Sequence, residues 1–226
     1  MDHIQNNISK RLKTIGGMVE HKTLIDIGCD HALLPVYLLG LGIITKAIAT
    51  DISAPSLKKG KENATTQGFA AHIDFIHADG MQGVDCTGFD TCVIAGMGGY
   101  SIISILDAAE LSFKQLVLSP QRDVADVRKY LHSRGYSIYD EVMIEDGGKV
   151  YNIIDARQSN IAQSYSDAGY AFGEALINRK CPILREYIEK ELRTTSHHLT
   201  GNLPQSRLKE LASYKKFCEE VLGCIR

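Results

Sequence analysis

The sequence lacks the features that mark secreted, zinc-binding and membrane proteins. None of its six cysteines forms a C-x-x-C pair, so we expect neither a structural zinc site nor a disulfide framework. No apolar run approaches the roughly 20 residues that span a bilayer. The N-terminal segment also lacks the apolar core of a secretion signal. We therefore expect a cytoplasmic protein with reduced thiols, no metal and no membrane contact.

The chain also has no excess of basic charge. Its formal net charge is −2 and its pI is about 6.4, so a nucleic-acid partner must be bound by local groups of cations. One such group is Lys10, Arg11 and Lys13, on a helix predicted over residues 2–15. These cations face away from the apolar side of that helix. A solvated surface is one interpretation, and contact with a phosphate backbone is the other.

A dinucleotide-binding fingerprint is absent too. Residues 23–27 are typical of a buried strand, and Gly28 follows at the turn into the next helix. If Gly28 began a G-x-G-x-x-G motif, Asp30 would occupy the second glycine position, and a pyrophosphate would meet a carboxylate. This disfavours an NAD-dependent dehydrogenase. The sulfonium cation of S-adenosylmethionine suits the acidic turn, whereas helix capping by Asp26 and Asp30 is the purely structural alternative.

Acidic residues also follow the next two predicted strands. Asp51 ends the strand 47–51, about 20 positions beyond the glycine turn, where a carboxylate commonly binds ribose hydroxyls. Asp79 follows the strand 72–77. Because the carboxyl ends of neighbouring parallel strands share one edge, we expect Asp26, Asp51 and Asp79 to converge on a ligand. For Asp51, capping of the following helix is the alternative.

The remaining pattern completes an α/β fold. Strands predicted at 89–95 and 115–118 alternate with helices, and a hairpin follows over 136–154. Five β/α units closed by an antiparallel hairpin predict a class I Rossmann-like methyltransferase with a seven-stranded mixed sheet.

A helical hairpin, similar to a coiled coil, is predicted near the C-terminus. Apolar residues there recur every three or four positions between Leu184 and Val221. We expect a methyltransferase domain over residues 1–160 and a helical appendage that contacts RNA over residues 161–226.

Five motifs together resemble a known family. They are Asp26-Ile27-Gly28-Cys29-Asp30-His31-Ala32-Leu33-Leu34-Pro35, Ala78-Asp79-Gly80-Met81, Ala95-Gly96-Met97-Gly98-Gly99, Ser119-Pro120-Gln121 and Glu145-Asp146-Gly147-Gly148-Lys149-Val150-Tyr151. This combination resembles the bacterial tRNA (adenine-22-N1)-methyltransferase family, TrmK, over nearly the whole chain. Cys29, Asp51 and the segment 119–121 depart from the family, where serine, glutamate and Gln-Pro-Asn are common.

The resemblance implies transfer of a methyl group from S-adenosyl-L-methionine to N1 of adenine 22 in tRNA, giving 1-methyladenosine. Such a transfer needs alignment more than a strong base. The catalytic candidates are Asp30, His31 and Gln121. The cofactor-binding candidates are Asp26, Gly28, Asp30, His31, Asp51, Ile52, Asp79, Gly80, Ala95, Gly96 and Met97. The RNA-binding candidates are Lys10, Arg11 and Lys13, and we expect the protein to be a monomer.

Two alternatives stay open at this point. The acidic pI favours a methyltransferase acting on another RNA, a protein or a small molecule. A non-catalytic adenosine-binding module, whose helical tail recruits a partner, is the other. Transfer of a labelled methyl group distinguishes an enzyme from such a module.

Overall fold

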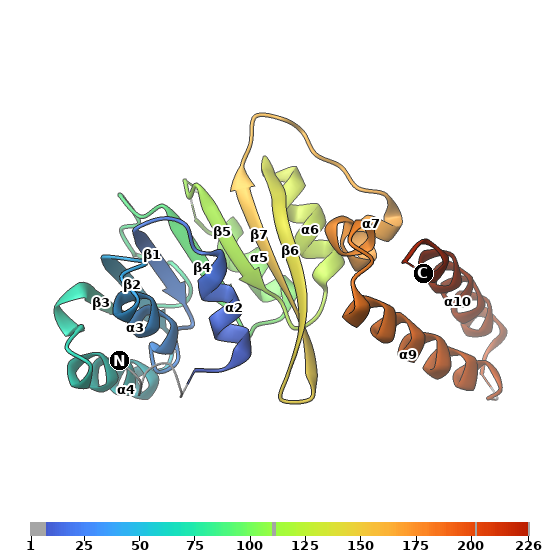
Figure 1. Cartoon of the computed structure of the whole chain (residues 1–226), viewed down its shortest axis with the longest axis horizontal. Coiled ribbons are helices and arrows are strands. Elements are labelled where there is room, and N and C mark those ends of the chain that lie inside the picture. Colours follow the sequence, from blue (N-terminus) through green and yellow to red (C-terminus); the bar gives the residue numbers. More distant parts are fainter. Residues whose placement is uncertain (1–7, 110–111, 202, 226) are drawn as a thin grey trace.

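The computed structural model describes residues 8–109, 112–201 and 203–225. Within them, a seven-stranded sheet has the order β3-β2-β1-β4-β5-β7-β6 (Figure 1). The strands are β1 (Thr23–Ile27), β2 (Lys46–Asp51), β3 (Ile73–His77), β4 (Thr91–Ala95), β5 (Gln115–Ser119), β6 (Tyr136–Asp146) and β7 (Lys149–Gln158). The strands β1 to β5 are parallel, and β7 pairs antiparallel to β5. The predicted mixed sheet is therefore confirmed.

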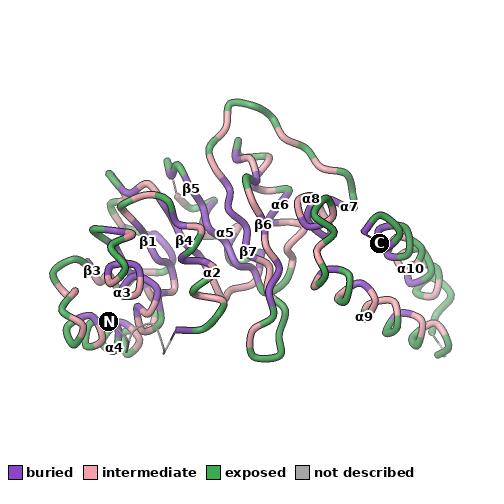
Figure 2. The backbone as a smooth tube through the Cα atoms, in the orientation of Figure 1, coloured by how far each residue is buried: buried purple, intermediate pink, exposed green. Residues whose placement is uncertain are grey.

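Helices cover both faces of the sheet and bury two separate cores. One face carries α2 (Lys10–Met18), α3 (Leu33–Gly40) and α4 (Ala54–Thr66), and the other carries α5 (Gly99–Asp107) and α6 (Val124–Ser133). A short 3-10 helix, η1 (Ala70–His72), precedes β3. Figure 2 shows the buried positions concentrated along the strands between these two layers.

The helix predicted over residues 2–15 has different bounds. Its first part, residues 2–7, lies outside the described residues. Ser9 has an extended backbone and its side chain accepts the N–H of Leu12, so α2 begins at Lys10 and continues to Met18. Serine is a favoured N-cap residue, so this helix begins after Ser9. The apolar spacing alone predicted one helix running through that position.

The hairpin of β6 and β7 turns at Gly147 and Gly148. Both glycines have positive φ, +57° and +74°, as a two-residue hairpin turn requires. Since Leu118 of β5 pairs with Ile154, the start of β7 extends past the carboxyl end of β5. The hairpin tip therefore projects at the sheet edge where the parallel strands end.

The C-terminal helices form a third core beside β6. They are α7 (Asp167–Phe172), α8 (Glu174–Asn178), α9 (Pro182–Leu199) and α10 (Gln205–Ile225). The helices α9 and α10 pack together as the predicted hairpin, at the end of the molecule opposite β3 (Figure 1). Met143 of β6 joins Leu184, Ile188 and Val221 in this core, which attaches the hairpin to the sheet.

A buried ion pair ties α7 to the sheet. Arg128 of α6 is 1% exposed and Glu141 of β6 is fully buried. The Arg128 Nε donates to Glu141 Oε1 at 3.0 Å, and its Nη1 donates to the carbonyl oxygens of Tyr170 and Ala171 at 2.7 and 3.1 Å. One guanidinium on α6 thus contacts acceptors on two other elements, β6 and α7.

Removing one member of this ion pair should lower the free energy of unfolding more than replacing both members with apolar residues. Glu141→Leu leaves the Arg128 charge buried without its counter-ion and should lower the free energy of unfolding by about 3–5 kcal/mol. The double variant Arg128→Met with Glu141→Leu should lose less stability than Glu141→Leu alone. Urea unfolding monitored by circular dichroism measures both, and a double variant no more stable than Glu141→Leu would contradict the account.

Candidate functional site

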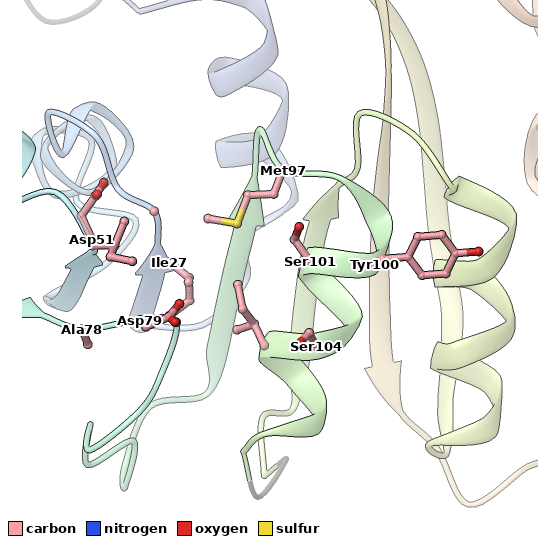
Figure 3. Close-up of a pocket in the computed structure, with 12 residues that line it drawn as sticks. Ile27, Asp51, Ala78, Asp79, Met97, Tyr100, Ser101 and Ser104 are labelled. Carbon is pink, nitrogen blue, oxygen red and sulfur yellow. The ribbon is translucent and has the colours of Figure 1, made fainter.

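A cavity of about 510 Å³ opens at the carboxyl edge of the sheet, a volume that suits a small molecule (Figure 3). Its lining residues are Ile27, Gly28, Asp51, Ile52, Ala78, Asp79, Gly80, Met97, Tyr100, Ser101, Ser104 and Ile105. They come from the ends of β1 and β2, the loops after β3 and β4, and α5. Six of the predicted cofactor-binding residues are among them: Gly28, Asp51, Ile52, Asp79, Gly80 and Met97.

Two glycines give the cavity its shape. Gly28 has a φ of +69°, and a Cβ there would lie 2.3 Å from the Cε of Met97. Gly80 has a φ of +63°, and a Cβ there would lie 3.0 Å from Ile105. In Figure 3 the Met97 side chain extends from the loop after β4 toward Ile27 and Asp51. The absence of a side chain therefore leaves space for Met97 at Gly28 and for Ile105 at Gly80, and both of these side chains line the cavity.

The Asp51 carboxylate is held by two backbone groups. Its Oδ2 accepts the N–H of Asp30 at 3.0 Å, and its Oδ1 accepts the N–H of Ser53 at 2.8 Å. The Ser53 side chain, which accepts the N–H of Ser56, is the N-cap of α4. A carboxylate has about four acceptor positions, so each Asp51 oxygen retains one toward the cavity. Two adjacent hydroxyl groups of a ribose fit such an arrangement.

Apolar and acidic groups stand beside Asp51. Ile52 is 69% exposed although it is a large apolar side chain, and it lines the cavity together with Ile105. Asp79 is exposed and also lines the cavity. An adenosine offers a flat apolar base, an exocyclic amine and a diol, so these residues fit that ligand.

Asp26 is buried in β1, with 6% of its surface exposed, and does not line the cavity. Burial, with a smaller contribution from the charge of Asp51, raises the pKa of Asp26 to about 7. Capping does not explain Asp26 or Asp30, because the N-cap of α3 is Ala32 and no side chain caps it. Two of the three predicted carboxylates, Asp51 and Asp79, thus reach the cavity itself.

The catalytic candidates lie around the cavity rather than in its lining. Asp30 and His31 are in the turn before α3, where their side chains approach each other at 3.5 Å and stay largely solvent-accessible. The side chain of Asn63 donates to the His31 carbonyl at 3.1 Å. Gln121 is exposed, and its backbone N–H donates to the Met97 carbonyl at 2.9 Å. That bond joins the loop after β5 to the loop after β4.

Arg11 does not face away from the fold as the sequence predicted. Its backbone N–H donates to Asp146 Oδ2 at 2.9 Å, and its guanidinium lies 4.9 Å above the ring of Tyr151. A Cβ on Gly96 would lie 3.6 Å from Arg11 Nη1. Contact with the hairpin turns this one cation toward the glycine loop after β4, Gly96-Met97-Gly98-Gly99, while Lys10 and Lys13 stay exposed.

The predicted residues Ala95 and Gly96 form the start of that loop. Ala95 ends β4, and the Gly96 N–H donates to the Ser119 carbonyl at 3.3 Å. Neither residue lines the cavity. Ser119 is fully buried, and its Oγ has no hydrogen-bond partner among the described residues.

Several lining residues were missed from the sequence. They are Ile27, Ala78, Tyr100, Ser101, Ser104 and Ile105. Ser101, Ser104 and Ile105 are three and four residues apart, which is the spacing of one helix face. Because this spacing follows directly after the glycine loop, it is a sequence signal that this face of α5 lines the cavity.

Other kinds of site are not found in the described part of the chain. No group of three or more His, Cys, Asp or Glu side chains there is suited to hold a metal ion. No helix in those residues is long and apolar enough to cross a membrane. A second cavity of about 500 Å³ lies beside Cys86, between the loop after β3 and the end of α5.

Comparisons with known proteins give a consistent result. The family model described as TrmK, tRNA (adenine(22)-N(1))-methyltransferase, matches residues 24–222. The tRNA (adenine(22)-N(1))-methyltransferase of Bacillus subtilis is 30% identical over 95% of this chain and 97% of its own length.

Solved structures are similar across the same span. The crystal structure of the B. subtilis m1A22 tRNA methyltransferase TrmK has a TM-score of 0.85 at 28% identity, covering 96% of this chain and 99% of that one. A Streptococcus pneumoniae protein crystallised with S-adenosyl-L-methionine has a TM-score of 0.87 at 27% identity, covering 95% and 99%. Motifs, topology and full-length similarity agree, and the chain belongs to the TrmK family of tRNA (adenine(22)-N(1))-methyltransferases.

Proposed function

We propose that the cavity at the carboxyl edge of the sheet binds S-adenosyl-L-methionine and that the protein uses it to methylate N1 of adenine 22 in tRNA. Family membership supplies the reaction. The observation that carries the assignment of the site is the Asp51 carboxylate, fixed by two backbone N–H groups and open to the cavity beside Gly28. Acting on tRNA, the protein would work in the cytoplasm.

Each part of the donor has residues suited to it. Asp51 accepts hydrogen bonds from the ribose hydroxyls, and Asp79 accepts one from the adenine amino group. Ile52 and Ile105 contact the faces of the adenine ring. Gly28 lets the backbone approach the methionine portion closely. Asp26, Asp30 and His31 lie around this turn, and the carboxylates of Asp26 and Asp30 add negative charge near the sulfonium cation.

The chain's own residues mainly align the reactants. The bound donor supplies an electrophilic methyl group, which passes to the N1 lone pair while the sulfur keeps the electrons of the broken bond. N1 lies on the Watson–Crick edge, so the adenine must leave its stack and enter a pocket. Gly96 and Met97 form one wall of that pocket, and Gln121 hydrogen-bonds the adenine edge. Asp30 or His31 relieves the positive charge that develops on the methylated base by accepting a proton from its N6 amino group.

The tRNA is held outside the cavity. We propose that Lys10, Arg11 and Lys13 contact phosphates and that residues 161–226 form a second RNA-contacting surface beyond a methyltransferase domain over residues 1–160. Donor cavity and glycine loop both come from one chain, so a monomer suffices for the reaction.

The reaction itself is tested with an unmodified tRNA transcript that carries adenine at position 22. Incubation with the protein and S-adenosyl-L-methionine should give 1-methyladenosine, detected by mass spectrometry of the nucleosides. A transcript with guanine at position 22 is the control and should gain no methyl group. Methylation of a guanine, of adenine N6, or of protein would overturn the proposed substrate.

Donor binding should depend on the two carboxylates that line the cavity. Asp51→Ala and Asp79→Ala should each weaken binding by about 1–3 kcal/mol, because each removes hydrogen bonds to a buried ligand group. Asp74→Ala is the matched control, since Asp74 forms only a surface ion pair with Lys46. Calorimetry measures all three, and unchanged affinity in both cavity variants would refute the assignment.

Donor affinity should also rise as the pH passes through 7. The pKa of Asp26 is about 7 in the free protein, and a nearby cation favours the ionised carboxylate. Below that pH the carboxylate is protonated and its attraction to the sulfonium is absent. Calorimetry from about pH 6 to pH 8 should show this rise in affinity for S-adenosylmethionine and a smaller rise for S-adenosylhomocysteine. In Asp26→Asn, neither ligand should show a rise in affinity over this range. Equal pH profiles for both ligands would contradict it.

A further inference from the structure

Two guanidinium groups flank the glycine loop that follows β4. A Cβ on Gly96 would lie 3.6 Å from Arg11 Nη1, and a Cβ on Gly98 would lie 2.9 Å from Arg122 Nε. Two residues of chain span at most about 7 Å, so the cations rest on neighbouring parts of one short loop. Glycine at 98 leaves the space that the Arg122 side chain occupies.

Both guanidinium groups are available to an anion. The Arg122 side chain is 79% exposed, and its one ion pair among the described residues is a long one, with Nε 3.6 Å from the Asp123 carboxylate. The Arg11 guanidinium stacks on Tyr151, and only the Arg11 backbone contacts Asp146. Stacking on an aromatic ring orients a guanidinium without neutralising its charge.

Backbone hydrogen bonds fix Arg122 to the glycine loop. The Gly99 N–H donates to the Arg122 carbonyl at 3.0 Å, and the neighbouring Gln121 N–H donates to the Met97 carbonyl at 2.9 Å. Met97 lines the donor cavity from the same loop. The backbone of Arg122 is therefore held beside the methyl donor site.

We propose that Arg122 binds a tRNA phosphate and that, with Arg11 on the other side of the loop, it holds the backbone on either side of the target adenosine. This inference rests on the proposed function and adds to it a residue for the acceptor strand. The planar guanidinium presents paired donors that match phosphate oxygens. An adenine that has left its stack needs its flanking backbone held in place, and cations beside Gly96 and Gly98 are suited to do this.

The inference is tested by tRNA binding and single-turnover methylation with the full-length protein and a transcript carrying adenine 22. Arg122→Ala should raise the tRNA Kd about tenfold at low salt and reduce the slope of log K against log salt by about one unit. Arg122→Lys should keep most of the slope, because the charge remains. The affinity for S-adenosylmethionine and the Tm should stay as in the wild type.

Arg134→Ala is the matched control. Arg134 lies just past the other end of α6, where its side chain is 44% exposed and 4.0 Å from Asp107. It should change neither the slope nor the tRNA affinity. Combining Arg11→Ala with Arg122→Ala should reduce the slope by about two units.

These measurements distinguish a failure of the inference from a failure of the proposed function. If the wild type methylates adenine 22 and Arg122→Ala has an unchanged slope and tRNA Kd, the inference is wrong and the proposed function stands. Weakened binding of S-adenosylmethionine in Arg122→Ala would place the residue at the donor and also overturn the inference. A wild-type protein that transfers no methyl group to tRNA overturns the proposed function, and the inference with it.

Discussion

The position of the Asp51 carboxylate is the constraint on which the candidate site depends. It accepts one backbone N–H from the turn after β1 and one from the start of α4, so it holds the ends of two neighbouring strands together. Asp30, which supplies the first N–H, has a φ of +48°, a conformation unfavourable for a residue with a side chain. The hydrogen bond to Asp51 helps to offset that cost and keeps the Gly28 turn open.

In the proposed site, the glycine loop after β4 lies between the methyl donor and the acceptor adenine. Met97 covers Gly28 on the donor side, and the flanking glycines at 96 and 98 are approached by arginines from α2 and from the loop before α6. The hairpin tip, which projects past β5, orients Arg11 through Asp146 and Tyr151. Positioning is the main requirement for transfer from an already activated methyl group, and this loop supplies it from backbone that three hydrogen bonds to the segment 119–122 hold in place.

Local patterns predicted most of the fold. Apolar runs that end at Asp or Gly predicted the strands, and the paired glycines at 147 and 148 predicted the hairpin. These predictions were possible because buried strands and tight turns each restrict the residue types directly. The placement of Arg11 was not predictable, since it depends on the hairpin meeting α2 from more than 130 residues away in the chain. The burial of Asp26 likewise follows from how the layers pack, and it has no signature within one segment. The cavity-facing side of α5 does have a local signature, the spacing of Ser101, Ser104 and Ile105.

The central claim is that Asp51 and the Gly28 turn hold the donor while the glycine loop separates it from the acceptor. A crystal structure of the protein with S-adenosylhomocysteine tests this most directly. The account predicts the ribose hydroxyls on the Asp51 carboxylate, the adenine between Ile52 and Ile105, and the sulfur beside Gly28 and Met97. A ligand bound in the second cavity beside Cys86, or a ribose that does not contact Asp51, would contradict it.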